Sequence, residues 1–131
     1  MVIYIKKLIV LLLCLLPIGV YAQDWTRVAC PGKGHTAIYN QIMNGIVNPL
    51  GADLGYDDGH QFKFYVAPPS ENCYEVIHTI DIVLYDEAFL YAIDQSVSFG
   101  NDMHSCMEEV RSQVGLLEYA LQNVFDLPKS K

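Results

Sequence analysis

The pattern of apolar residues predicts an α+β fold: a small antiparallel sheet of about three strands, packed by an N-terminal and a C-terminal helix. Three features of the sequence support this prediction. An apolar stripe with helical spacing comes early, alternating and β-branched residues fill the middle, and an amphipathic stretch with a capping residue comes last. Two such helices on one face of the sheet would bury both apolar stripes.

The first 22 residues have the pattern of a secretory signal peptide. Two lysines precede the apolar run 8–16, Pro17 breaks this run, and a Val-Tyr-Ala sequence then offers short residues for cleavage. The run is about half of the roughly 20 residues that a membrane-spanning helix needs. We therefore expect residues 1–22 to be removed, leaving a single domain of residues 23–131 that is secreted or periplasmic and has no membrane anchor.

The expected mature domain is strongly acidic. Loss of Lys6 and Lys7 changes the net charge from −7 to −9, because all 15 aspartates and glutamates lie beyond the signal. Nucleic-acid binding depends on cations that neutralise phosphates, so this charge argues against a nucleic-acid partner and against adsorption to anionic lipid. Two interpretations of the charge are left: the domain binds a basic protein partner, or the charge simply keeps the domain soluble.

The first predicted element is a helix over Thr36–Val47. Ile38, Ile42 and Ile46 recur every fourth residue and form one apolar stripe. Pro49 should end the helix, because the residue before a proline is disfavoured in the helical region. Residues 50–59, which contain three glycines and three aspartates, are predicted to form turns.

The middle of the chain is predicted to form strands. Phe62, Phe64 and Val66 alternate with polar residues over 60–66, a pattern typical of a half-buried strand. Residues 75–85 and 88–98 contain many β-branched side chains and predict two more strands joined by a turn. The same stretch also fits a helix over 71–93, and the alternative fold is then a mostly α-helical bundle with a short hairpin.

The last predicted element is an amphipathic helix that begins after Asn101 or Asp102. Either side chain can cap the first turn. Glu108 and Glu109 follow in the early turns, where the helix dipole favours negative charge, and we expect both to be surface charges.

Three cysteines lie beyond the predicted signal, so at least one has no partner within the chain. We expect a disulfide between Cys73 and Cys106, which would stabilise the fold by roughly 3–4 kcal/mol on a chain-entropy estimate. Cys30 lies in a turn-rich stretch and is predicted to be exposed, either unpaired or joined to Cys30 of a second copy in a homodimer.

The sequence gives little evidence for a metal site or a catalytic site. Each of these three cysteines has a histidine close by, but the spacings of common metal sites are missing, so no cofactor is expected. No nucleophile motif occurs either, and a non-enzymatic protein is expected. The alternative function is a small metal- or ligand-binding protein that would use histidines, with these candidates: His35, His60, His78 and His104. His78, inside an apolar run, is expected to be a hydrogen-bonded core residue.

The candidate binding residues are Tyr56, Asp57, Asp58 and His60, in the most polar loop of the chain. An EF-hand does not fit this loop, because the twelfth position counted from Asp53 is a phenylalanine where calcium needs a bidentate glutamate. Tyrosine and aspartate together suit the binding of a basic protein. The sequence therefore favours an exported protein-binding domain, of the kind that inhibits a basic hydrolase or neutralises a secreted toxin.

Overall fold

The computed structural model describes residues 24–127; the predicted signal peptide lies outside this range. The elements follow one another in this order: β1 (Thr26–Ala29), α1 (His35–Ile42), a π-helical segment η1 (Met43–Val47), α2 (Asn48–Leu50), β2 (Asp53–Asp57), β3 (Gln61–Val66), β4 (Cys73–Tyr85), β5 (Ala88–Phe99), α3 (Met103–Gln122) and a 3-10 turn η2 (Val124–Asp126).

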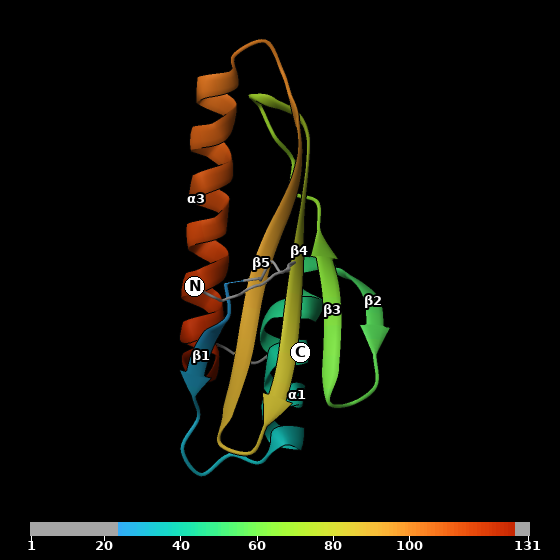
Figure 1. Ribbon diagram of the computed structural model, residues 1–131, viewed down its shortest axis with the longest axis vertical. Helices are drawn as coiled ribbons and strands as arrows, with labels where there is room; N and C mark the ends of the chain where they lie inside the picture. Colours follow the sequence, from blue (N-terminus) through green and yellow to red (C-terminus); the bar gives the residue numbers. More distant parts are fainter. Residues whose placement is uncertain (1–23, 128–131) are drawn as a thin grey trace, which may run out of the picture.

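The fold is α+β, as the sequence predicts, but the sheet has five strands instead of three. All neighbouring strands are antiparallel, in the order β1-β5-β4-β3-β2 (Figure 1). The three predicted strands are β3, β4 and β5, and the two strands that were missed, β1 and β2, form the two edges of the sheet.

Both missed strands lack a local signal. β1 has four residues, too few to show an alternating pattern, and only Val28 among them is buried. β2 is exposed along its whole length and lies in the glycine- and aspartate-rich stretch that was predicted to be turns. Its extended conformation comes from hydrogen bonds to β3, whose side chains fill the core.

The long hairpin of β4 and β5 excludes the helical alternative for residues 71–93. Every second residue of β4 from Val76 to Leu84 is buried against the core, and these residues pair with β5 in continuous register. Asp86 and Glu87 form the turn, as predicted. Glu87 has a positive φ of 66°, which is held in place because its N–H donates to the Lys33 carbonyl and its carbonyl accepts from the Cys30 N–H.

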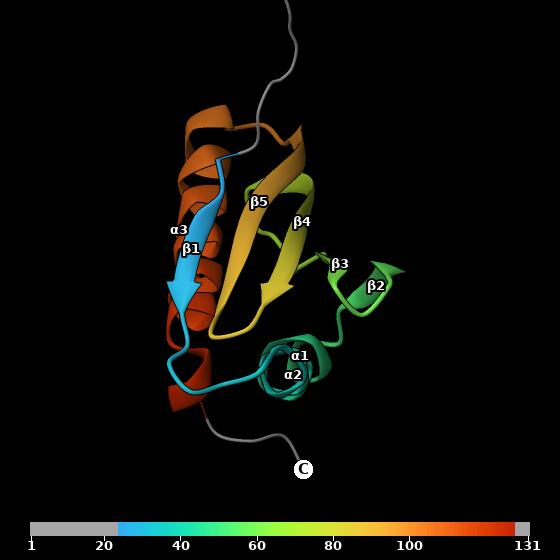
Figure 2. The same ribbon diagram turned by 60° about the horizontal axis from the view of Figure 1, so that its bottom comes forward.

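Both longer helices pack on one face of the sheet. Ile38 and Ile42 from α1 join Leu117 and Leu121 from α3 in a single core cluster with the inward residues of the central strands. α3 runs along β4 and β5, and α1 lies at the end of the sheet where the β4–β5 turn is found (Figures 1 and 2). Within residues 24–127, no helix covers the opposite face of the sheet.

Pro49 does not end the first helix, so this prediction is wrong. Asn48 keeps helical dihedral angles, and the helix ends at Gly51, which has a φ of 63°. Gly51 N–H donates to the Asn48 carbonyl, and Ala52 N–H donates to the Val47 carbonyl, the hydrogen-bond pattern of a Schellman motif. A wider π-helical segment precedes Pro49, where the Asn48 N–H donates to the Met43 carbonyl.

β4 and β5 extend beyond the other strands and form an arm. β3 pairs only with the part of β4 from His78 to Val83, and β1 pairs only with the first residues of β5. Above these contacts, residues 73–77 and 96–99 form a two-stranded ribbon that packs on the first half of α3 (upper part of Figure 1). The rest of the described structure is called the body below.

Candidate binding site

The four candidate binding residues lie together at the tip of the β2–β3 hairpin. Tyr56 and Asp57 end β2, and Asp58 and His60 belong to the turn that leads into β3. All four are exposed, and 55% of the Tyr56 surface is accessible. The four residues therefore lie on one exposed hairpin, and their role in binding stays a prediction.

The two aspartates build the turn in addition to carrying charge. Asp57 Oδ1 accepts a hydrogen bond from the Gly59 N–H at 2.9 Å. Asp58 Oδ1 accepts from the His60 N–H at 2.9 Å and from the Gln61 N–H at 2.7 Å. Side-chain bonds of this kind replace main-chain bonds in tight turns, so both carboxylates are held in fixed positions.

Two tyrosines fix the outer oxygens of the same carboxylates. The Tyr39 hydroxyl, from α1, donates to Asp57 Oδ2 at 2.7 Å, and the Tyr56 hydroxyl donates to Asp58 Oδ2 at 2.9 Å. Hydrogen bonds from the Gln61 and His60 N–H groups and from Tyr56 lower the pKa of Asp58, while the carboxylates raise the pKa of both tyrosines. Asp58 is therefore ionised and the tyrosines neutral at pH 7.

The β4–β5 turn lies beside this hairpin and extends its surface. The His60 ring meets the Tyr85 ring edge-on, with 5.8 Å between centroids, and the Leu84 N–H donates to the His60 carbonyl. Next to Tyr85, Asp86 Oδ1 accepts a hydrogen bond from the His35 N–H and lies 3.0 Å from His35 Nδ1, and both contacts lower the pKa of Asp86. We call the combined surface the acidic tip, made of Tyr56, Asp57, Asp58, His60, Tyr85 and Asp86.

The four histidines considered for metal binding make separate contacts, although His35 and His60 both lie near the β4–β5 turn. His35 contacts Asp86, His60 contacts Tyr85, and His104 is exposed at the start of α3. His78 is buried, as predicted, with Nε2 2.7 Å from Gln113 Oε1. Among residues 24–127, no three side chains of histidine, cysteine, aspartate or glutamate gather closely enough to hold a metal ion.

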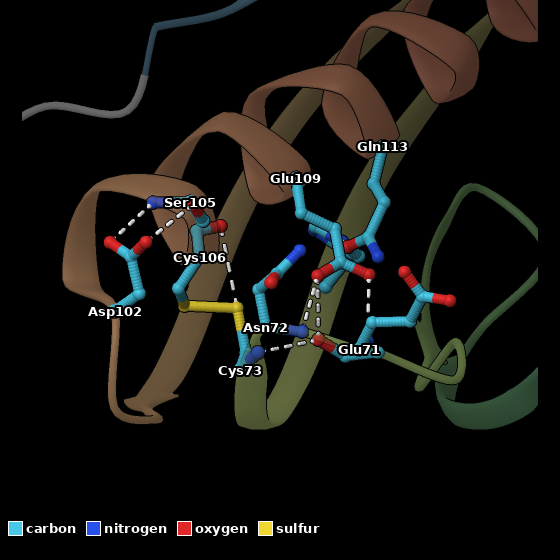
Figure 3. Close-up of a disulfide and its surroundings, with 10 residues drawn as sticks. Glu71, Asn72, Cys73, Asp102, Ser105, Cys106, Glu109 and Gln113 are labelled. Carbon is cyan, nitrogen blue, oxygen red and sulfur yellow. Dashed lines mark hydrogen bonds between the residues drawn. A yellow bond between two sulfur atoms is a disulfide. The ribbon is translucent and has the colours of Figure 1, made fainter.

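The predicted disulfide between Cys73 and Cys106 is present and joins β4 to α3 in the arm, with 4.8 Å between the Cα atoms (Figure 3). Cys106 therefore carries no free thiol. Cys30 carries a free thiol, and its predicted exposure is wrong: only 3% of its surface is accessible. Although the residues that follow are exposed, Cys30 itself packs into the core, and burial raises the pKa of its thiol.

Glu109 is not the free surface charge that the sequence suggests. Its carboxylate accepts hydrogen bonds from the Ser70 hydroxyl and from the N–H groups of Glu71 and Asn72, at 2.9–3.2 Å (Figure 3). These bonds, led by the one from Asn72, lower the pKa of Glu109. Glu108 does lie at the surface, where it pairs with Arg111, and Asp102 caps α3 through the Ser105 N–H, as predicted.

A second surface feature, which the sequence did not indicate, is a cleft of about 620 Å³ at the end of β3. Its lining is mostly apolar and comes from three segments that are separate in sequence, 50–53, 65–69 and 77–79. The lining residues are Leu50, Gly51, Asp53, Tyr65, Val66, Ala67, Pro68, Pro69, Ile77 and Thr79. No local pattern predicts this cleft, because it forms where β4 continues past the last residue of β3.

Comparison with known proteins does not add to this geometry: a scan of protein-family models gives no match, and no curated protein or solved structure matches the chain at a significant level.

Proposed function

We propose that the protein is an exported, non-enzymatic binding domain that captures a basic protein through the acidic tip, as an inhibitor or immunity protein does. The observation that carries this proposal is the fixed geometry of the tip. Its carboxylates are already held by hydrogen bonds from the hairpin and from Tyr39. A partner that binds them therefore has little ordering of side chains or loop to bring about, and ordering is a main cost of association.

The charge balance of the described chain supports a basic partner. Residues 24–127 contain all 15 acidic side chains but only four cations, which are Arg27, Lys33, Lys63 and Arg111. Lys63 lies 3.7 Å from Asp81, Arg111 pairs with Glu108, and Lys33 lies over the Phe125 ring. Most of the negative charge is thus unbalanced at the surface, and such a field speeds the encounter with a positively charged protein.

Two further observations are compatible with export. The Cys73–Cys106 disulfide is typical of proteins in an oxidising compartment. Among residues 24–127, none of the helices has both the length and the apolar composition needed to cross a membrane. Export itself is tested by expressing the full chain and measuring the mass of the purified protein, which is expected to begin at Gln23.

The partner is sought by using the purified protein as bait for the extracytoplasmic proteins of its native source, at low and at near-physiological salt. The captured protein is then tested against the double variant Asp57→Asn/Asp58→Asn. Asparagine keeps the Oδ1 acceptor that the turn needs and removes both charges. We expect slower association and a weaker dependence of the association rate on salt.

The matched control is Glu75→Gln/Glu118→Gln, which removes the same amount of charge from exposed positions outside the tip. An equal loss of association rate in both double variants would mean that only the net charge matters. An unchanged rate for Asp57→Asn/Asp58→Asn at low salt would contradict the acidic tip as the binding site.

A further inference from the structure

The cleft at the end of β3 lies on the face of the sheet that neither α1 nor α3 covers, and Leu50 at the end of α2 forms part of its lining. Asp53, Tyr65 and Thr79 are directly paired across β2, β3 and β4, so their side chains form a row on this face. Ile77 continues the apolar surface along β4, and Pro68 and Pro69 border it where the chain leaves β3. The result is an apolar cleft with one carboxylate at the edge strand.

Asp53 differs from the other aspartates of its segment. Asp57 and Asp58 each accept hydrogen bonds that build the hairpin. Within residues 24–127, the structure gives no hydrogen bond or ion pair to the carboxylate of Asp53, which is exposed at the rim of the cleft. The hairpin does not use this charge, so it is available to a ligand.

Gly55 explains how the Tyr65 ring comes to form one wall. A Cβ atom at Gly55 would lie 2.7 Å from Tyr65 Cε2 and 2.9 Å from the Tyr65 hydroxyl oxygen, closer than side chains approach each other. The absence of a side chain at Gly55 therefore allows the ring to lie across β2. An aromatic ring placed over a strand glycine is a known stabilising contact, and here it also leaves 37% of the Tyr65 surface exposed beside Asp53.

We propose that this cleft receives an arginine or lysine side chain of the basic partner. The long aliphatic part of such a side chain would pack on Tyr65, Leu50 and the prolines, and its cation would pair with Asp53. Arginine and lysine combine an apolar stem with a terminal charge, which matches apolar walls with a single carboxylate at the rim. A cation beside the Tyr65 ring would also interact with its π-electrons. This inference rests on the proposed function, since it gives the partner a second point of attachment.

The cleft is tested without the partner, by titrating N-acetyl-arginine amide into the isotope-labelled protein and following amide chemical shifts. Saturable shifts are expected at Tyr65, Ile77 and Thr79. N-acetyl-citrulline amide, which has the same shape and no charge, should bind about two- to fivefold more weakly, the range for an exposed ion pair. The variant Asp53→Asn should remove this preference for arginine. Absence of saturable shifts, or equal binding of the two compounds to the unmodified protein, would overturn the inference.

Two more variants separate the contributions of charge and shape. Glu118→Gln removes one exposed charge from α3 and should leave the titration unchanged. Gly55→Ala forces the Tyr65 ring to move and should weaken binding of both compounds, while the spectrum of the core residues shows that the fold is retained. Unchanged binding in Gly55→Ala would contradict the role of the ring.

Tests with a captured partner distinguish this inference from the proposed function. If the partner binds equally to Asp53→Asn and to the unmodified protein, the cleft inference is wrong and the acidic tip can still be the binding site. If no basic partner is captured at all, the proposed function fails, and the arginine titration still shows whether the cleft binds a cationic side chain.

Discussion

The body and the arm are stabilised in different ways. In the body, four of the five strands pack with the helices and bury one continuous cluster of sixteen residues, to which the exposed strand β2 contributes none. In the arm, a two-stranded ribbon and half a helix bury only four: Cys73, Val76, Cys106 and Val110. Such a ribbon is at best marginally stable without further support. The arm receives this support from the disulfide and from the hydrogen bonds of Glu109.

The boundary between the two regions is a polar contact. His78, on β4, and Gln113, on α3, are hydrogen-bonded to each other between the two apolar clusters. His78 Nδ1 is the buried side-chain atom of the described residues that lacks a hydrogen-bond partner. Burying such an atom is unfavourable, so this contact contributes less to stability than apolar packing would. The comparison shows that a small region with little apolar surface depends on specific bonds, whereas a large core depends on packing.

The largest effect is expected from a cavity in the body. Phe64 is fully buried, and Phe64→Ala should lower the free energy of unfolding by about 3–5 kcal/mol, the usual cost of this truncation. Val110→Ala in the arm removes fewer atoms from a smaller cluster and should cost about 1–2 kcal/mol. Urea denaturation measures both. If Phe64→Ala does not fold, Phe64→Leu replaces it. Its loss in the free energy of unfolding should be smaller than that of Phe64→Ala but still larger than that of Val110→Ala. An equal or larger loss for Val110→Ala would contradict the comparison.

Removal of the disulfide should have the next largest effect, concentrated in the arm. The double variant Cys73→Ala/Cys106→Ala is expected to lose about 2–4 kcal/mol of stability, because the unfolded chain gains freedom. Amide hydrogen exchange should accelerate first at residues 73–77 and 96–99, while body amides such as that of Ile80 stay protected. Cys30→Ala, which leaves the disulfide intact, serves as the control. A uniform loss of protection in both regions would show that the arm is no separate unit of stability.

The smallest effect is expected from Glu109, and it should depend on pH. Hydrogen bonds from Asn72, Ser70 and Glu71 lower the pKa of Glu109 in the folded protein. The carboxylate therefore contributes stability above its unfolded pKa of about 4.3, and this contribution is lost as the pH falls below that value. Glu109→Gln should be less stable than the unmodified protein at pH 7, with the difference shrinking in acid. Thermal unfolding at pH 7 and pH 3 measures this, and a difference that is independent of pH would exclude a charge effect.

Local patterns predicted the parts of the fold that carry their own signals. The alternation of Phe62 and Phe64, the β-branched residues of β4 and the cap at Asp102 each reflect the preference of a short segment. The pairing of Cys73 with Cys106 was also predicted, from their positions near the starts of two regular elements. The exposure of Tyr56 and Asp58 followed from the polar composition of their loop. Apart from the disulfide, which joins two residues 33 positions apart, these features depend on neighbours in sequence, which is why the sequence alone determined them.

Other features were decided only by contacts between distant segments. The edge strand β2 is extended because β3 offers hydrogen bonds, and Cys30 is buried because it packs in a core cluster whose other members come from distant segments. Glu109 contacts the loop 70–72 only because β4 packs against α3. The cleft beside Asp53 exists only because β4 extends beyond the last residue of β3. Hydrogen bonds and burial between separate segments are set by the tertiary structure, and no periodicity within one segment encodes them.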